Sequence, residues 1–118
     1  MDVAILVDWS TYFTEAYWQY ILEYLRKYAD GVYSTAEGLA GGVRVALIGY
    51  SNTARVVFNF NSGTSAANVK RQIDTLGRQA GYRRPDQALK LARRDLFVSA
   101  GGARPGVRKV SCFKNISI

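Results

Sequence analysis

The segment Val3-Ala4-Ile5-Leu6-Val7-Asp8-Trp9-Ser10 indicates the fold of this chain of 118 residues. Its five consecutive apolar residues predict a central strand that is covered on both faces, because such strands lack the alternation of half-exposed ones. Asp8 ends the strand. In an open sheet of mostly parallel strands, binding sites lie beyond the carboxyl ends of the strands, where the strand order reverses. The sequence therefore places Asp8 at a candidate binding site.

Helix and strand patterns alternate after this segment. They predict a helix over residues 12–29, a glycine-containing loop over 31–42, a strand over 43–50 and, after a short turn, an antiparallel strand over 54–60. Two further helices follow, the second starting at Pro85, and a fourth strand is expected over 107–113. This order predicts an α/β fold with an open, doubly wound, mostly parallel sheet and one antiparallel edge strand.

The first helix is rich in aromatic residues. Tyr17, Tyr20 and Tyr24 recur at helical spacing together with Ile21 and Leu25, which predicts that the three tyrosines are core and boundary residues of its packed face. Trp18 falls off that face and is expected to be exposed. A ligand platform made of these rings is the alternative. Trp9, beside the end of the first strand, is the better candidate for a ligand contact, and a packed tryptophan is its alternative reading.

The composition fits one soluble domain and excludes several classes of function. The chain is 48% hydrophobic and 21% charged, and no apolar run approaches the ~20 residues of a membrane span. It begins with no signal-peptide pattern. Its one cysteine cannot form an internal disulfide, and the lack of histidine excludes the common zinc sites and catalysis by a histidine base.

Positive charge is concentrated in the second half of the chain. Residues 60–118 hold twelve Lys and Arg against three Asp and Glu, a balance of +9, whereas residues 1–59 hold four against six, a balance of −2. Such a half indicates either solvated helix faces or a polyanion-binding surface. The candidates for a polyanion site are Arg78, Arg83, Arg84, Arg93, Arg94 and Arg104.

The segment from Asp2 to Ser10 resembles the opening strand and the Asp-x-Ser-x-Ser loop of von Willebrand factor A-type domains. Residues 42–51 resemble the second strand of that family and residues 54–61 its edge strand. Gly81, Ala88-Leu89 and residues 106–110 fall where the family has its glycine-rich loop, its next helix and the approach to strand four. Within that family, the sequence pattern most resembles the A domains of matrix proteins such as matrilins and type VI collagen chains. The resemblance implies a three-layer α/β/α domain over residues 1–110.

The family resemblance also implies a metal-ion-dependent adhesion site, in which oxygen ligands hold Mg²⁺ and a partner's carboxylate completes the coordination. Asp8 and Ser10 match the first two ligands. Tyr12 stands in place of the second serine, Arg83 in place of the threonine, and the aspartate of the family's Thr-Asp-Gly has no counterpart. We therefore expect a degenerate site with Asp8 and Ser10 as vestigial metal ligands, no Mg²⁺ and no other cofactor.

The guanidinium of Arg83 has the donors to pair with the Asp8 carboxylate in place of the missing cation. If the loop over residues 77–84 lies beside the end of the first strand, this pair should form. The candidate binding residues at this end of the sheet are Asp8, Trp9, Ser10, Tyr12, Tyr82, Arg83 and Arg84.

The last residues depart from the family pattern. Ser111-Cys112-Phe113-Lys114 replaces the expected apolar strand, so residues 111–118 are interpreted as a divergent tail and the domain as truncated at its C-terminus. The missing part is expected in a parent protein, or a partner copy closes the sheet.

Two functions remain open. The first is a non-catalytic protein-binding module for adhesion or matrix assembly, whose partner is a protein such as a matrix component or collagen, and whose location is extracellular by resemblance. The second is a basic module that binds nucleic acid or a sulfated glycan, which a steep salt dependence of binding would indicate. No constellation of residues supports an enzyme.

Overall fold

Four strands form one mixed sheet in the computed structural model, which describes residues 1–114. The strands are β1 (Asp2–Asp8), β2 (Arg44–Tyr50), β3 (Ala54–Phe58) and β4 (Lys109–Lys114), in the order β3-β2-β1-β4. β1 pairs in parallel with both β2 and β4, and β3 is antiparallel to β2. The predicted mostly parallel sheet with one antiparallel edge strand is confirmed.

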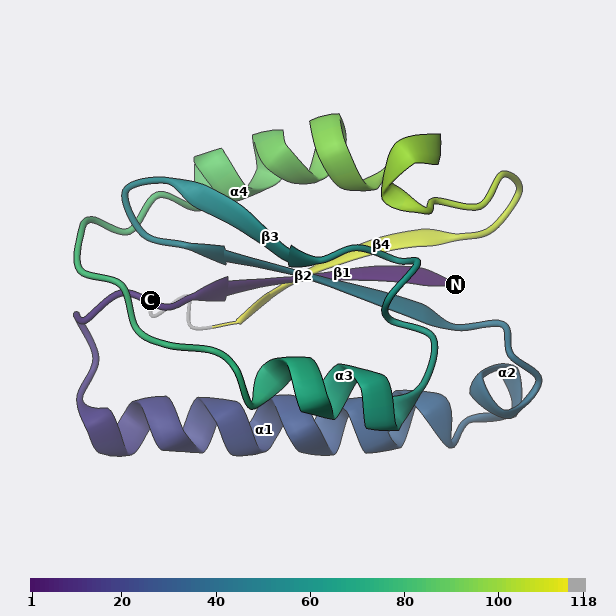
Figure 1. Ribbon diagram of the computed structural model, residues 1–118, viewed down its shortest axis with the longest axis horizontal. Helices are drawn as coiled ribbons and strands as arrows, with labels where there is room; N and C mark the ends of the chain where they lie inside the picture. The colour runs from purple at the N-terminus through teal and green to yellow at the C-terminus, as the bar shows by residue number, and fades with distance from the viewer. Residues whose placement is uncertain (115–118) are drawn as a thin grey trace.

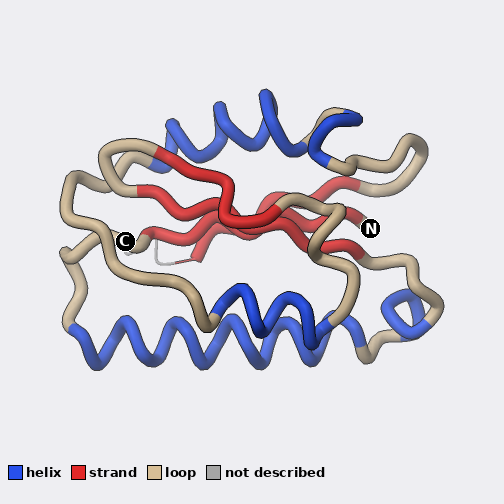
Figure 2. Tube along the Cα trace, viewed as in Figure 1, coloured by secondary structure: helices blue, strands red, loops and turns tan. Residues whose placement is uncertain are grey.

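Helices cover both faces of the sheet, which makes a three-layer α/β/α arrangement (Figures 1 and 2). α1 (Glu15–Tyr33) and α3 (Ala66–Ile73) lie on one face, and α4 (Pro85–Leu91) lies on the other, continued by a π-helical segment over Ala92–Leu96 and, after a break, a 3-10 turn over Ser99–Gly101. The short α2 (Ala36–Leu39) precedes β2. The apolar residues of β1 alternate between the two cores, because Val3, Ile5 and Val7 face α1 and Ala4 and Leu6 face α4.

α1 begins and ends later than the sequence pattern predicts. The Thr14 side chain caps it by accepting from the Tyr17 N–H, and the helix continues through Asp30-Gly31 to Tyr33. Gly31 does not end the helix, because Val32 in its last turn is buried in the core and packing there outweighs the poor helix propensity of glycine.

The packed face of α1 includes the predicted Ile21 and Leu25 but not Tyr17 and Tyr20. Trp18, which was expected to be exposed, is buried with Ile21, Leu22 and Leu25 against the sheet. Tyr17 and Tyr20 lie on the solvent side, and Tyr20 is 59% exposed, whereas Tyr24 lies at the edge of the packed face, where it lines a cavity with Tyr28 and Cys112. The prediction for Tyr17 and Tyr20 was wrong because tyrosines and aliphatic residues recur here with the same period. The hydroxyl group of tyrosine allows it to lie at the solvent-exposed side of the helix.

β4 extends across the boundary predicted at residue 110. Residues 111–114, assigned to the divergent tail, continue the strand and pair with β1, and the rest of that tail, 115–118, lies outside the described residues. No helix of the described residues is long and apolar enough to cross a membrane.

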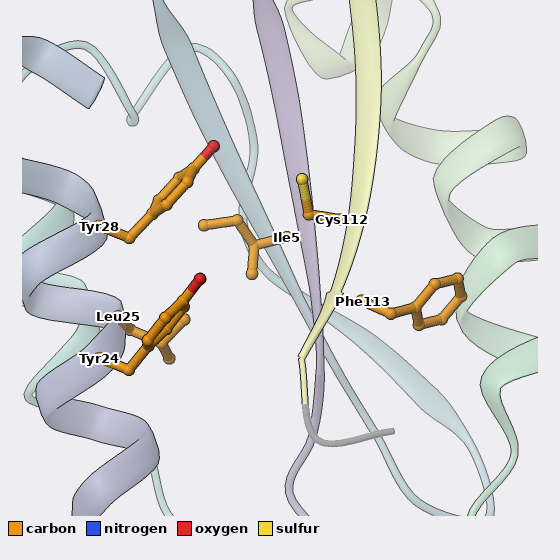
Figure 3. Close-up of a pocket in the computed structure, with 6 residues that line it drawn as sticks. All are labelled: Ile5, Tyr24, Leu25, Tyr28, Cys112 and Phe113. Atoms are coloured by element: carbon orange, nitrogen blue, oxygen red, sulfur yellow. The ribbon is translucent and has the colours of Figure 1, made fainter. Parts of the chain in front are cut away.

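A small cavity of about 60 Å³ lies between α1 and β4 (Figure 3). The side chains of Tyr24 and Tyr28 extend from α1 toward the sheet, Cys112 comes from β4, and Phe113 points to the opposite face. Burial raises the pKa of the Tyr28 phenol. The cavity offers one thiol and two phenols, which form neither an acid/base pair nor a metal site.

The amino end of β1 is fastened by Arg104. The buried Asp2 carboxylate accepts from Arg104 Nε at 2.9 Å and from Nη2 at 2.7 Å, while its other oxygen accepts from the Arg104 backbone N–H at 2.9 Å. The same Nη2 also donates to the carbonyls of Met1 and Gly42. Burial alone would raise the pKa of Asp2, but the hydrogen bonds and charge of Arg104 hold it below its usual value.

Candidate functional site

The carboxyl end of β1 carries the predicted site loop. The Trp9 N–H donates to the Tyr50 carbonyl at 3.1 Å, and the Ser10 N–H donates to Asp8 Oδ1 at 2.9 Å, so the chain turns tightly after the strand. Asp8 and Ser10 are both buried. An isolated parallel bridge joins Ser10 to Gln79, and the Gln79 N–H donates to the Trp9 carbonyl at 2.8 Å. The loop between α3 and α4 therefore lies beside the end of β1, as predicted, and Figure 1 shows it at that end of the sheet.

Arg83 from this loop pairs with Asp8. Its Nε lies 2.6 Å from Asp8 Oδ2, and Asp8 is fully buried whereas the Arg83 side chain is partly exposed. The guanidinium also lies over the rings of Tyr12, at 4.8 Å, and Phe13, at 5.1 Å. Stacking on two rings while bonding a carboxylate is an arrangement that a planar guanidinium can make and a metal ion cannot. The predicted pair is therefore present.

Tyr50, the neighbour of Asp8 in the sheet, keeps its phenol protonated at neutral pH. Burial first, and then the negative charge of Asp8, raise the pKa of Tyr50 to about 12, with Arg83 acting in the opposite direction. Tyr50 ends β2 directly beside Asp8 in the sheet. At neutral pH the charged groups of this end of β1 and β2 are thus the carboxylate and the guanidinium that neutralise each other.

The loop carrying Arg83 is held by backbone contacts to the β2–β3 turn. The Tyr82 N–H donates to Asn52 Oδ1 at 2.6 Å, and the Arg84 N–H donates to the Ser51 carbonyl at 3.0 Å. Gly81 has a φ of 138°, and a Cβ there would lie 2.8 Å from Asn52 Cγ, so a side chain at this position would be strained and would push the Asn52 side chain aside.

The predicted binding residues fall into a buried and an exposed group. Asp8, Trp9 and Ser10 are buried, with Trp9 only 4% exposed, so the reading of Trp9 as a packed residue describes it better than that of an open contact. Tyr12 and Tyr82 are 69% and 80% exposed, and Arg84 is exposed and paired with Asp86 at 2.8 Å. That hydrogen-bonded pair lowers the pKa of Asp86 to about 2.

The residues at this end do not fit the Mg²⁺ that the resemblance implies. Ser10 Oγ is buried without a hydrogen-bond partner among the described residues, as an abandoned ligand oxygen would be. Both Asp8 oxygens, however, already accept hydrogen bonds, one from the Ser10 N–H and one from the Arg83 cation. Tyr12 contributes its ring to Arg83. Among residues 1–114, no three His, Cys, Asp or Glu residues come together in a group that could hold a metal ion.

Sequence patterns missed four residues that shape the site: Gly49, Asn52, Arg55 and Gln79. The Trp9 indole lies over Gly49, where a Cβ would come within 2.1 Å of the ring. Arg55, on β3, places its guanidinium 5.0 Å from the centre of the same ring. Gly49, inside the predicted strand, was the one signal in the sequence, because a glycine within a strand often marks a place where another group packs closely against the backbone. Arg55, Asn52 and Gln79 gave no signal at all.

Most candidates for a polyanion site are neutralised within the chain. Arg78, Arg83, Arg84, Arg94 and Arg104 pair with Glu15, Asp8, Asp86, Asp95 and Asp2, respectively. Arg93 is the exception among the six in the part of the chain that the structure describes. The excess of basic residues therefore does not form one open cluster of unpaired charges.

Comparison with known proteins identifies the fold and its relatives. The profile of the von Willebrand factor type A domain family matches residues 2–112. The collagen alpha-6(VI) chain of Homo sapiens is 26% identical over 103 residues, which cover 87% of this chain and 4% of that relative. The Homo sapiens collagen alpha-5(VI) chain is 28% identical over 83 residues, covering 70% and 3%, respectively.

Solved structures share the same architecture. Proximal thread matrix protein 1 from the mussel byssus superposes with a TM-score of 0.81 at 20% identity, over 95% of this chain and 29% of that one. A structure of the same mussel protein with a zinc-occupied MIDAS motif gives a TM-score of 0.79 at 22% identity, over 95% and 27%. The von Willebrand factor domain of the pili tip protein Mfa5 from Porphyromonas gingivalis gives 0.70 at 18% identity, over 93% and 35%. The chain thus spans a small part of each relative.

Proposed function

This chain belongs to the von Willebrand factor type A domain family, and from that premise we propose that it is a non-catalytic, protein-binding module of the extracellular matrix whose adhesion site works without a metal ion. Its relatives are collagen VI chains, and its structural neighbours include a thread matrix protein. These names support a protein partner in a matrix, and an extracellular location follows from the same relatives.

The observation that carries the metal-free part is the pair of Arg83 with Asp8 at 2.6 Å. A divalent cation at Asp8 would have to displace a guanidinium that is held by the carboxylate and two aromatic rings. Close approach of two cations on one buried carboxylate is unfavourable, and breaking the existing pair would add its own cost. We therefore expect a partner to meet a preformed, neutral ion pair in place of an open coordination position.

Binding to purified proteins tests the proposal. The chain is passed over immobilised collagen VI and over immobilised heparin, in buffer with Mg²⁺, in buffer with EDTA and at rising salt. We expect binding to the protein that EDTA does not change and that salt weakens only modestly. The alternative polyanion module predicts instead binding to heparin that falls steeply with salt, because each neutralised anion releases counterions.

An Arg83→Thr variant provides the matched comparison. It restores the hydroxyl type that the family has at that position but leaves Tyr12 where a serine is expected. We expect this variant to expose Asp8 without acquiring a dependence on Mg²⁺. Binding of the unmodified chain that is abolished by EDTA would contradict the metal-free site, and binding to heparin alone would contradict the protein-binding module.

A further inference from the structure

A polar hollow of about 400 Å³ lies next to the Asp8–Arg83 pair, on the side of β2 and β3. The turn between those strands forms one wall and the segment following α3 forms another. Backbone hydrogen bonds fix both walls: the Ser51 N–H donates to the Thr53 carbonyl, and the Gln79 N–H donates to the Trp9 carbonyl. The lining residues are Trp9, Ser51, Asn52, Thr53, Arg55, Gln79 and Ala80.

The hollow is built on a rigid floor. Trp9 is buried because Gly49 leaves the space that its indole fills; even an alanine there would place an atom 2.1 Å from the ring. The guanidinium of Arg55 lies over the same ring, 5.0 Å from its centre. Stacking restricts the long side chain in advance, which lowers the entropy lost on binding, and leaves the N–H groups in the guanidinium plane available to an acceptor.

Arg55 carries the charge of this hollow. It is exposed, and the described residues place no carboxylate within ion-pair distance of it, whereas Arg78, Arg83 and Arg84 at the same end of the sheet each have one. The other polar lining side chains are neutral amides and hydroxyls. Asn52 uses its oxygen to accept from the Tyr82 N–H, so its NH₂ group is left to donate elsewhere. The lining therefore complements an anion.

The geometry points to this hollow as a binding site for an acidic side chain of a partner protein, with the Arg55 guanidinium receiving the carboxylate and Asn52 or Gln79 donating beside it. The inference rests on the proposed protein-binding function. It adds the place on this chain where the partner binds and the chemical group of the partner that is recognised. One prearranged guanidinium favours a single carboxylate over a polyanion, which would need a row of unpaired cations. Arginine binds carboxylate through two parallel hydrogen bonds, which requires no metal.

The test uses small probes in the presence of EDTA. N-acetyl-aspartate N-methylamide is titrated into the chain, with the matching asparagine compound as the neutral control, and the Arg55 Nε–H and Trp9 indole signals are followed by NMR. We expect saturable shifts in the millimolar range with the aspartate compound and none with the asparagine compound. Arg55→Ala should weaken the binding at least tenfold, and Arg55→Lys should weaken it partly because the planar fork is lost.

Arg93→Ala is the matched control. Arg93 is an exposed arginine on the α4 side that has no ion pair with any residue of the range 1–114, and its replacement should leave the titration unchanged. Equal affinity of Arg55→Ala, or no saturable shift with the aspartate compound, would overturn the inference. Tighter binding of inorganic phosphate or of a heparin fragment would overturn it in favour of a general anion site or a polyanion surface. The titration contains no matrix protein, so its failure is separate from failure of the proposed function.

Discussion

Each end of β1 has a buried aspartate paired with an arginine from a later loop, and the two pairs have different surroundings. At the amino end, Arg104 binds Asp2 and two backbone carbonyls and so joins three segments of the chain. At the carboxyl end, Arg83 binds Asp8 while lying over aromatic rings, one of them on the highly exposed Tyr12. The same two residue types thus join separate segments of the chain at one end and, in the function that we propose, take the place of a metal ion at the other.

The largest expected effect is at the amino end. Arg104→Ala removes the guanidinium from the buried Asp2 carboxylate and from the carbonyls of Met1 and Gly42, and leaves that carboxylate the N–H of residue 104 and the Lys109 ammonium at 3.8 Å. We expect a loss of about 3 kcal/mol in the free energy of unfolding, measured by urea denaturation. Arg108→Ala is the matched control, because Arg108 is a neighbouring exposed arginine whose side chain donates to Met1 Sδ and has no carboxylate within ion-pair distance among the described residues. Equal stability of the two variants would show that the Arg104 side chain does not stabilise the fold.

A smaller loss is expected at the carboxyl end. Arg83→Ala removes the guanidinium from the buried Asp8 carboxylate but leaves the Ser10 N–H bonded to it, and should cost about 2 kcal/mol in the same measurement. If Arg83→Ala destabilises the chain more than Arg104→Ala does, the contrast between the two ends is reversed.

Acid should weaken the amino-end pair. The folded pKa of Asp2 is lowered from its model-peptide value of 3.8, so its contribution to stability is fully present above that value and is lost as the pH falls through the folded pKa. We expect the urea midpoint to drop between pH 5 and pH 2, and Asp2→Asn to make this dependence shallower. A pH dependence unaltered by Asp2→Asn would exclude Asp2 as its source.

The smallest effects are expected at the surface pairs. Arg84 and Arg94 bind Asp86 and Asp95 in solvent, where side-chain entropy and screening cancel most of the attraction. Replacing either arginine by alanine should leave the urea midpoint within experimental error of the unmodified chain. A clear loss of stability in Arg84→Ala would mean that the loop beside Asp8 depends on that pair.

The sheet could be predicted because a continuous apolar strand ending in aspartate is a strong local pattern. The Asp8–Arg83 pair joins distant residues, and its prediction rested on the family resemblance. The orientation of α1 could not be predicted, because tyrosines and aliphatic residues alternate with the same period and burial of Trp18 depends on the sheet it meets. The stacking of Arg55 on Trp9 was equally hidden, since it joins residues of different strands through the missing side chain of Gly49.

The charged residues show the same limit. Arg104 was grouped with the polyanion candidates because composition counts charges without their partners. In the structure its guanidinium binds the buried Asp2, and the guanidinium groups of four other candidates in that group also pair with carboxylates of the same chain. Pairing across 102 positions of sequence, as between Asp2 and Arg104, is set by topology and is invisible to a local pattern.

The most direct test of the metal-free site is an NMR titration of the Arg83 Nε–H with Mg²⁺, the signal being assigned by its loss in Arg83→Lys. We predict a slowly exchanging Nε–H signal, shifted by its bond to Asp8, that neither Mg²⁺ nor EDTA moves. A saturable shift or loss of this signal with Mg²⁺, absent in Asp8→Asn, would show that a metal competes with Arg83 for Asp8 and would contradict the account.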